Sequence, residues 1–285
     1  MRSIAKLMKD WQFTGPNGVT TAVELPHTWN ARDGQDGGND YWRGCCTYCT
    51  RFAAPVYDPA QQQVWLQFEG VNASAAVLLN GQQLCTHDGG YSTFRAEVTE
   101  LLQAENQLTV RVDNSVNDRV YPQKADFTFY GGIYRDVSLL VVNKNHIALG
   151  HFGDTGVKIT PDLKEGSADI QVETLVEGEG TVAVELLDAE GNSVARGEGS
   201  KASLHLDAPH LWNGVKDPYL YTCIVRLVED GKPVDEVRTK VGLRSFSVDA
   251  KKGFFLNGKP YPLHGVSRHQ DRKGLGNAIT REMHD

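Results

Sequence analysis

Alternation of apolar and polar residues runs through most of this chain and constrains its fold more than any other feature. The clearest segments each place three apolar side chains on one face: Val64, Leu66 and Phe68 in "VWLQF", and Leu108, Val110 and Val112 in "QLTVRVDN". Period-two alternation is typical of strands that bury one face. No convincing helical stripe precedes the C-terminal end. We therefore predict an all-β fold in which sheets pack on one another.

Turn dipeptides between the alternating segments predict antiparallel hairpins. Asn80-Gly81 separates "AAVLL" from "QQLCTH", and Asn257-Gly258 follows "GFFL". Asp230-Gly231 and Glu190-Gly191 mark two more turns. An asparagine or aspartate followed by glycine readily takes the positive φ angles of a type I′ turn.

A chain of 285 residues is long enough for two domains. Up to residue 142 the many short strands indicate a β-sandwich or jelly roll. Residues 143–243 hold shorter alternating segments, and about seven strands in roughly a hundred residues fit an immunoglobulin-like sandwich. No Cys–Trp–Cys core is present there, so the prediction covers only the architecture.

The last part of the chain, residues 244–285, follows a different pattern. "YPLHGV" predicts a short buried strand, and Thr280 stands where a helix N-cap belongs, with Glu282 in the first turn. A strand, a loop and the start of a helix make one β/α unit. Because a single unit cannot close a barrel, we expect an incomplete third domain.

Composition excludes several classes of function. The net charge is −7 and no basic stripe is present, which disfavours nucleic acid and anionic membranes as partners. The longest apolar runs are too short to span a bilayer. The N-terminus lacks the apolar segment of a signal peptide, so we expect a cytoplasmic protein.

Five cysteines are present, three of them in "CCTYC". A structural zinc site needs four ligands, usually as two spaced pairs, and no second pair accompanies this cluster. We therefore predict free, buried thiols in a reducing cytosol.

Several motifs follow one another in a recognisable order. They are "LPHTWNARDGQDGGNDYWRG", "GGYSTF", "FYGGIYRDVSLL", "LWNGVKDPYLYT", "VGLRSF" and "FFLNGKPYPLHGVSRH". In this order the chain resembles glycoside hydrolase family 2 over essentially its whole length. The family includes β-galactosidases, β-glucuronidases and β-mannosidases. The resemblance implies a sugar-binding jelly roll over 1–142, an immunoglobulin-like sandwich over 143–243 and the start of a (β/α)8 catalytic barrel over 244–285.

The resemblance also implies a retaining mechanism, which requires two carboxyl groups about 5 Å apart. In the family the acid is a glutamate preceded by asparagine, and no glutamate of this chain follows an asparagine. Glu282 is the sole glutamate of the barrel region and stands at a helix start, away from a strand end. We therefore predict the N-terminal portion of a retaining β-glycosidase that is inactive by itself.

β-Galactosidase is the favoured parent enzyme, on the resemblance of "DGQDGGNDYWRG" and "LWNGVKDPYLYT". A β-glucuronidase or β-mannosidase parent is the alternative, and so is a stand-alone carbohydrate-binding or interaction module. The expected partner is a β-linked oligosaccharide or galactoside. The family's several assemblies leave the oligomeric state open, with a homo-oligomer as one candidate. No cofactor is required, although a sodium or magnesium ion is a candidate in the full-length enzyme.

Two residues match positions of the family that contact the sugar. Asp126, in "ADFTFYGGIYRD", matches an aspartate that reaches into the active site and in some β-galactosidases binds sodium, which suits a carboxylate. A solvated turn aspartate is the alternative. His269, in "GVSRHQDR", matches a histidine that contacts the sugar in the transition state, and a structural histidine is its alternative.

The neighbours of His269 follow the family only in part. We expect Arg268 to orient nearby carboxylates, because a guanidinium pairs well with them. The family's β-galactosidases often carry glutamate after the histidine, whereas this chain carries Gln270.

The loop "ARDGQDGGNDYWRG" matches the rim of the family's active site, with Asn39 and Asp40 as candidate sugar contacts. A calcium loop beginning at Asp33 is the alternative, but its register fails because Gly44 stands where the bidentate glutamate belongs. Tyr41 and Trp42 either stack on a sugar ring or anchor the loop, and burial is the commoner fate of such rings.

Overall fold

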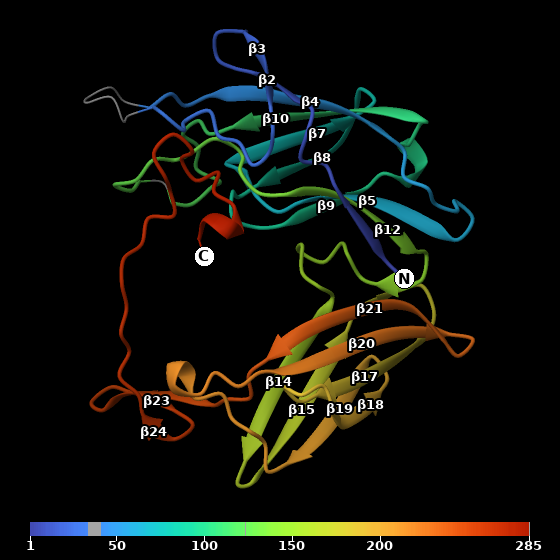
Figure 1. Cartoon of the computed structure of the whole chain (residues 1–285), viewed down its shortest axis with the longest axis vertical. Coiled ribbons are helices and arrows are strands. Elements are labelled where there is room, and N and C mark those ends of the chain that lie inside the picture. The colour runs from blue at the N-terminus through green and yellow to red at the C-terminus, as the bar shows by residue number, and fades with distance from the viewer. Residues whose placement is uncertain (34–40, 123, 285) are drawn as a thin grey trace. The chain divides into compact units, whose positions relative to one another are not determined.

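The computed structural model describes residues 1–33, 41–122 and 124–284 (Figure 1). The described residues form strands and single 3-10 turns, with no α-helix among them, which confirms the all-β prediction. None of them forms a helix that could cross a membrane. The chain divides into two compact units. The N-terminal unit comprises Ser3–Val141 and Arg268–Asp285, and the central unit comprises Met1–Arg2 and Val142–Ser267.

The N-terminal unit contains a six-stranded and a four-stranded antiparallel sheet. The larger sheet has the order β3 (Thr20–Val23), β2 (Trp11–Thr14), β4 (Cys45–Ala53), β10 (Glu105–Asp113), β7 (Ser74–Leu79), β8 (Gln82–Asp88). The smaller sheet has the order β1 (Ser3–Lys6), β12 (Val137–Asn143), β5 (Gln62–Phe68), β9 (Phe94–Glu97). A short pair, β6 (Val71–Asn72) and β11 (Gly132–Ile133), and one 3-10 turn, η1 (Thr99–Leu101), complete the unit's first segment.

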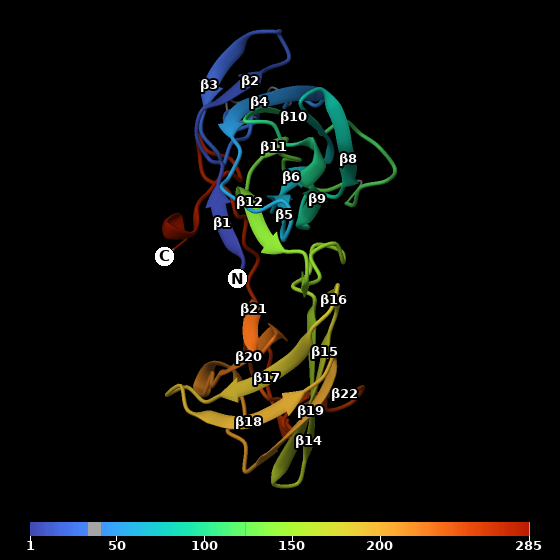
Figure 2. The ribbon, with the colours of Figure 1, turned by 90° about the vertical axis from the view of Figure 1, so that its right-hand side faces the viewer.

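The core of the N-terminal unit lies between these two sheets. Figure 2 shows β4 and β10 on one side of this core and β5, β9 and β12 on the other. The faces predicted from β5 and β10 are confirmed, because all six of their apolar side chains are fully buried: Val64, Leu66, Phe68, Leu108, Val110 and Val112. Alternation therefore places one apolar face of each strand in a shared core.

The central unit contains two main sheets and two small ones. The main sheets have the orders β14 (Val157–Lys164), β15 (Ser167–Thr174), β19 (Lys201–Asp207), and β18 (Ser193–Glu198), β17 (Thr181–Leu187), β20 (Tyr221–Glu229), β21 (Lys232–Val241). The small sheets pair β13 (His146–Ile147) with β16 (Val176–Glu177), and β22 (Phe246–Asp249) with β23 (Gly253–Leu256) and β24 (Lys259–Pro260). A 3-10 turn, η2, spans Gly214–Lys216.

Residues from both main sheets share the core of the central unit. Ile170 of β15 and Leu204 of β19 are buried in one cluster with Val184 of β17 and Val225 of β20. The sheets are immunoglobulin-like in this sense: each contributes one apolar face to a common interior.

The hairpin predictions are confirmed at all four dipeptides, because antiparallel strands pair across each of them. Both residues have positive φ angles at Asn80-Gly81 (52° and 85°), Asp230-Gly231 (47° and 74°) and Asn257-Gly258 (50° and 73°). At Glu190-Gly191 only the glycine does, with φ 90°, and the turn is closed by Asp188, whose N–H donates to the carbonyl of Asn192 at 2.9 Å.

Two local predictions near the C-terminal end are wrong. "YPLHGV", residues 261–266, forms no strand and is mostly exposed. The N–H of Tyr261 donates to the carbonyl of Phe254 in β23 at 3.0 Å, but residues 262–266 have no ladder partner among the described residues. The helix predicted after Thr280 is a single 3-10 turn, η3 (Arg281–Met283), and the Thr280 side chain does not cap it. Within residues 244–285, the chain up to Ser267 groups with the central unit and the chain from Arg268 onward with the N-terminal unit.

Candidate functional site

A cavity of about 270 Å³ lies in the N-terminal unit where two distant parts of the chain meet. One part supplies the aromatic side chains Tyr91, Phe127, Tyr130 and Tyr134. The other part is the segment Arg268 to Asp271, together with Asn277. A concave site that combines aromatic walls with a few polar groups is typical of small-molecule binding.

The wall that carries His269 is attached to the rest of the unit by two hydrogen bonds. The hydroxyl of Tyr130 donates to Oδ2 of Asp271 at 2.8 Å. Nη1 of Arg135 donates to the carbonyl oxygen of Asn277 at 3.0 Å. Ala278 and Ile279 are buried immediately after this segment. Apolar burial and hydrogen bonds together fix the wall.

The opposite wall is the loop that carries Tyr91. The N–H of Gly89 donates to the carbonyl of Ala73 at 2.9 Å, and the hydroxyl of Tyr134 donates to the carbonyl of Gly90. The Tyr91 ring remains 67% exposed, and its centroid lies 6.4 Å from that of Tyr134 in an edge-on arrangement. An exposed ring on a fixed loop can cover the apolar face of a bound molecule.

Two arginines, Arg135 and Arg268, give the cavity a cationic character. The guanidinium of Arg135 lies over the Tyr134 ring, 4.6 Å from its centroid. Of the described residues that line the cavity, Asp271 alone carries a carboxylate, and it accepts the Tyr130 hydrogen bond. Burial, the hydrogen bond to Asp271 and the charge of Asp271 raise the pKa of Tyr130 to about 12, so its hydroxyl remains a donor at neutral pH. These groups can bind and orient a polyol.

The cavity contains some of the residues predicted from the sequence and leaves others outside. His269 and Arg268 line it. Nη2 of Arg268 contacts Nδ1 of His284 at 2.5 Å, a histidine instead of the expected carboxylate. Asp126 is exposed and does not line the cavity, although its neighbour Phe127 does. Asn39 and Asp40 lie outside the described residues.

Comparison with known proteins identifies the family. The model of glycosyl hydrolases family 2 matches residues 151–244, and the model described as glycosyl hydrolase 2 galactose-binding domain-like matches residues 38–173. A β-glucuronidase of Bacteroides fragilis is 36% identical over 98% of this chain. The chain belongs to glycosyl hydrolase family 2.

Two further family 2 proteins extend the comparison. A β-galactosidase of Bacteroides ovatus is 30% identical over 95% of the chain. The crystal structure of an FMN-binding β-glucuronidase from Faecalibacterium prausnitzii superposes with a TM-score of 0.95 over 100% of the chain, at 38% identity. The chain spans 43% of the B. fragilis protein, 35% of the B. ovatus protein and 46% of the crystallised one, which is less than half of each.

The sequence did not predict most of the residues that line the cavity of this family 2 chain, among them the four that shape its walls: Tyr91, Tyr130, Tyr134 and Arg135. All four lie within or beside the motifs "GGYSTF" and "FYGGIYRDVSLL". The motifs gave the signal, but only the fold shows which of their side chains face one cavity.

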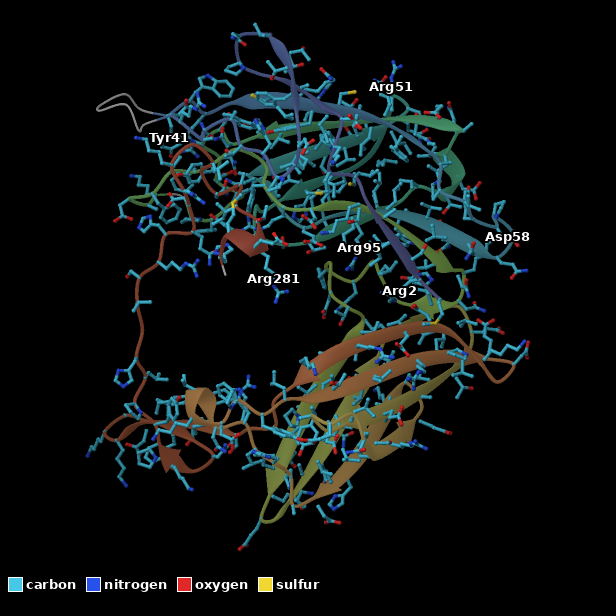
Figure 3. All side chains as sticks on the ribbon, viewed as in Figure 1. Arg2, Tyr41, Arg51, Asp58, Arg95 and Arg281 are labelled. Carbon is cyan, nitrogen blue, oxygen red and sulfur yellow. The ribbon has the colours of Figure 1, made fainter. Side chains whose placement is uncertain are left out.

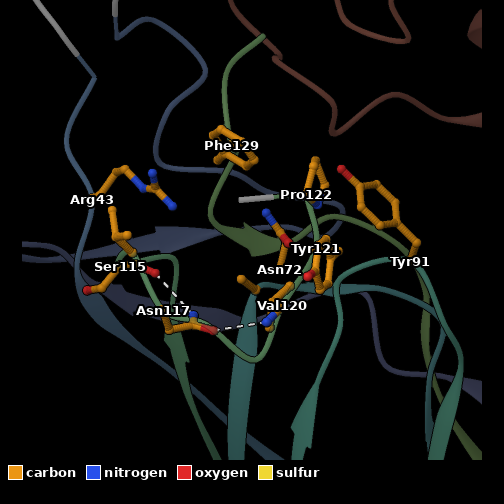
Figure 4. Close-up of a pocket in the computed structure, with 11 residues that line it drawn as sticks. Arg43, Asn72, Tyr91, Ser115, Asn117, Val120, Tyr121, Pro122 and Phe129 are labelled. Carbon is orange, nitrogen blue, oxygen red and sulfur yellow. Dashed lines mark hydrogen bonds between the residues drawn. The ribbon is translucent and has the colours of Figure 1, made fainter. Parts of the chain in front are cut away.

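A second, smaller pocket adjoins the first through Tyr91 (Figure 4). Nε of Arg43 donates to the carbonyl of Asn114 at 2.7 Å, and the guanidinium lies 4.8 Å from the centroid of the Phe129 ring. Its volume of about 20 Å³ suits about one water molecule. A sugar ring does not fit there.

The calcium alternative gains no support from the described part of its loop. Oδ2 of Asp33 accepts hydrogen bonds from Nδ2 of Asn30 at 2.9 Å and from the N–H of Trp42 at 3.2 Å. No group of three histidine, cysteine, aspartate or glutamate side chains that could hold a metal ion occurs in residues 1–33, 41–122 and 124–284. Burial of the loop aromatics was expected, and Trp42 is instead 37% exposed, with its ring 6.0 Å from that of Trp29.

The cysteines are free thiols, as predicted. Burial raises the pKa of Cys46 to about 12 and that of Cys223 to about 11, which keeps both protonated. The predicted burial is wrong for Cys45, which is exposed on the same strand as Cys46 because its side chain lies on the other face of that strand, and Cys49 and Cys85 are only partly buried. Figure 3 draws the side chains of both units as sticks on the ribbon, with sulfur atoms in yellow.

Proposed function

We propose that this chain is the N-terminal portion of a retaining β-glycosidase. In this proposal residues 1–142 form the sugar-binding domain, 143–243 an immunoglobulin-like support and 244–285 the first part of a catalytic barrel. The two catalytic carboxylates would come from a further part of the protein. Family membership and the share of the relatives' length that the chain spans support this assignment.

The observation that carries the proposal is the composition of the 270 Å³ cavity. It brings His269 beside aromatic side chains that suit a sugar, and its described carboxylate, Asp271, is engaged by Tyr130. A retaining glycosidase needs two carboxyl groups about 5 Å apart, one as acid and one as nucleophile. The cavity thus has the composition of a substrate rim that lacks the catalytic pair.

Two sugars are candidates for the substrate. A β-galactoside follows from the sequence motifs. A β-glucuronide is favoured by Arg135 and Arg268 at the cavity, because arginine pairs well with a carboxylate. The two most similar relatives reported above are named β-glucuronidases.

Turnover of p-nitrophenyl β-galactoside and p-nitrophenyl β-glucuronide tests the proposal. We expect no release of nitrophenol by the 285 residues and release by a longer protein that includes the barrel. The ratio of kcat/KM for the two substrates then decides the sugar. Failure of the longer protein on every β-glycoside would reject the enzyme assignment and leave a stand-alone binding module.

Sugar binding by the 285 residues is the more direct test of the site. We expect millimolar galactose or glucuronate to shift NMR signals of His269 and of the segment around Asp126. Replacing His269 with Gln should weaken the shifts, whereas the same change at His205, which lies on β19 of the central unit, should not. A cation at Asp126, sodium being the candidate, would need further oxygen ligands, because no group of three candidate ligands surrounds it among the described residues.

FMN is a second candidate ligand, on the description of the F. prausnitzii protein. A groove of about 410 Å³ in the central unit combines an apolar floor, which includes Val157 and Ile159, with Phe246, Lys240 and Arg244. An apolar floor and an aromatic ring suit a flavin, and two cations suit its phosphate.

Quenching of flavin fluorescence tests FMN binding to the intact chain. We expect saturable quenching in the micromolar range that weakens at least fivefold when Arg244 is replaced by Ala. The matched control is Lys251→Ala, a cation in the exposed turn between β22 and β23. Equal quenching by both variants would show that FMN binds outside this groove. No quenching by the unmodified chain would show that the chain does not bind FMN.

A further inference from the structure

Tyr130 is held in place through its backbone from two directions. Nδ2 of Asn72 donates to its carbonyl oxygen at 2.6 Å. The next residue, Gly131, donates its N–H to Oδ1 of Asn30 at 2.8 Å and accepts a hydrogen bond from the hydroxyl of Thr28 at 2.7 Å. Asn72, Asn30 and Thr28 are all buried. The position of the Tyr130 ring is therefore set by the sandwich.

The side chain of Tyr130 in turn holds the segment that carries His269. Its hydroxyl donates to Asp271, two residues after His269, at 2.8 Å. Its ring lies against Gly276, where an added Cβ would come within 2.7 Å of the Tyr130 Cε1 atom. Arg272 and Gly276 close this segment into a turn with hydrogen bonds of 3.0 and 2.8 Å. Tyr130 therefore touches the turn at both ends.

Tyr134 holds the loop that carries Tyr91 in the same way as Tyr130 holds the segment that carries His269. Its hydroxyl donates to the carbonyl of Gly90, the residue before Tyr91. Gly90 lies so close to Asn72 that a Cβ there would be 2.2 Å from the Asn72 Oδ1 atom. Asn72 thus bonds to the backbone of one tyrosine and packs against the loop held by the other.

We propose that Tyr130 and Tyr134 are positioning residues, which hold His269 and Tyr91, respectively, on opposite walls of the cavity. Neither hydroxyl needs to touch the sugar: each donates to a group beside the residue that it positions. The role in sugar binding rests on the proposed function, whereas the positioning itself does not.

Two matched substitutions test the two walls of the cavity independently. Tyr130→Phe and Tyr134→Phe each remove one hydroxyl and leave the ring. A hydrogen bond of this kind contributes about a fivefold factor to a local opening equilibrium. We expect Tyr130→Phe to speed amide hydrogen exchange at Arg272 and Gly276 about fivefold and to leave Gly89 unchanged. Tyr134→Phe should do the reverse, because Gly89 carries the backbone hydrogen bond of the other wall.

A second pair of variants checks that the bond to Asp271 carries the effect. Asp271→Asn keeps an oxygen that can accept the Tyr130 hydrogen bond and should retain slow exchange at Arg272. Asp271→Ala removes the acceptor and should match Tyr130→Phe. Unchanged exchange in Tyr130→Phe, or equal acceleration of both walls in either tyrosine variant, would overturn the proposal.

Sugar titration of the same proteins distinguishes the two hypotheses. If the unmodified chain binds galactose or glucuronate, Tyr130→Phe should weaken binding about threefold to fivefold without lowering the unfolding midpoint by more than about 3 °C. If the unmodified chain binds neither sugar, the 270 Å³ cavity does not bind sugar by itself, turnover by the longer protein still decides the proposed function, and the exchange data still decide the positioning role.

Discussion

Arg2 and Asp235 form a bidentate ion pair although 233 positions separate them in the sequence. Nε and Nη2 of Arg2 lie 2.8 and 2.6 Å from the two carboxylate oxygens, and the Asp235 side chain is only 1% exposed. The same carboxylate accepts the N–H groups of Ile147 and Glu236 at 2.9 Å each. The pair joins the start of the chain to β13 and β21 of the central unit.

Removal of Arg2 should destabilise the central unit. Arg2→Ala leaves the buried Asp235 carboxylate without its countercharge, and we expect a loss of about 3 kcal/mol in the free energy of unfolding. The control is Arg196→Ala, which breaks a pair with Glu185 whose arginine is 74% exposed and should cost less than about 1 kcal/mol. Urea denaturation measures both. Equal losses would show that Arg2–Asp235 behaves as a surface pair.

Tyr91 should contribute directly to ligand affinity. Its exposed ring lines the 270 Å³ cavity, so Tyr91→Ala removes stacking area, and we expect sugar affinity to fall about fivefold. Tyr121→Ala is the matched control, because Tyr121 is 79% exposed and lines only the small pocket. Titration by NMR measures both. An undiminished sugar affinity in Tyr91→Ala would show that the Tyr91 ring does not contact the sugar.

His27 should make the N-terminal unit less stable in acid. Burial lowers the pKa of His27 from 6.5 to about 4, beside Tyr48, whose hydroxyl is 2.7 Å from Nδ1. The unfolded chain binds this proton below pH 6.5 and the folded chain does so only below about 4. The free energy of unfolding is therefore unaffected by His27 above pH 6.5. It falls as the pH drops from 6.5 towards 4, by a total on the order of 3 kcal/mol, because protonation of His27 favours the unfolded chain.

The His27 contribution is measurable as a difference between two proteins. The free energy of unfolding of the unmodified chain should fall between pH 7 and pH 4 by more than that of His27→Phe, which cannot titrate. Parallel pH curves for the two proteins would contradict the prediction.

Cys45 should react before the buried thiols. The pKa values of all three thiols are raised, first of all by burial, but Cys45 is exposed whereas Cys46 and Cys223 are buried. A thiolate is the reactive form, so brief alkylation of the native protein should label Cys45 and leave Cys46 and Cys223 intact. Peptide mass spectrometry locates the label, and unfolding in denaturant should expose all three. Early labelling of Cys46 in the native protein would contradict its burial.

The strands and turns could be predicted because their signals are local. Alternation in "VWLQF" and "QLTVRVDN" identified the buried faces, since side chains on a strand alternate between its two sides. Asn80-Gly81 and Asn257-Gly258 identified turns because these dipeptides readily adopt positive φ angles. In each case a few adjacent residues determine the conformation.

Residues of the site could be predicted only where they match a position of a family motif. His269 was found through "GVSRHQDR", whereas the contact between Tyr130 and Asp271 spans 141 positions and leaves no local signal. "YPLHGV" failed for the same reason. An apolar hexapeptide becomes a strand only beside a partner strand, and no described strand pairs with residues 262–266.

Each unit is assembled from separated parts of the chain. The N-terminal unit buries Ala278 and Ile279, while the central unit includes Arg2. During synthesis the ribosome therefore releases the strands up to β12 long before the residues that complete their unit. Until the central unit has been synthesised, the surface that the segment from Arg268 onward covers stays exposed to solvent or to a chaperone. The last folding step of the N-terminal unit therefore follows the synthesis of the central unit.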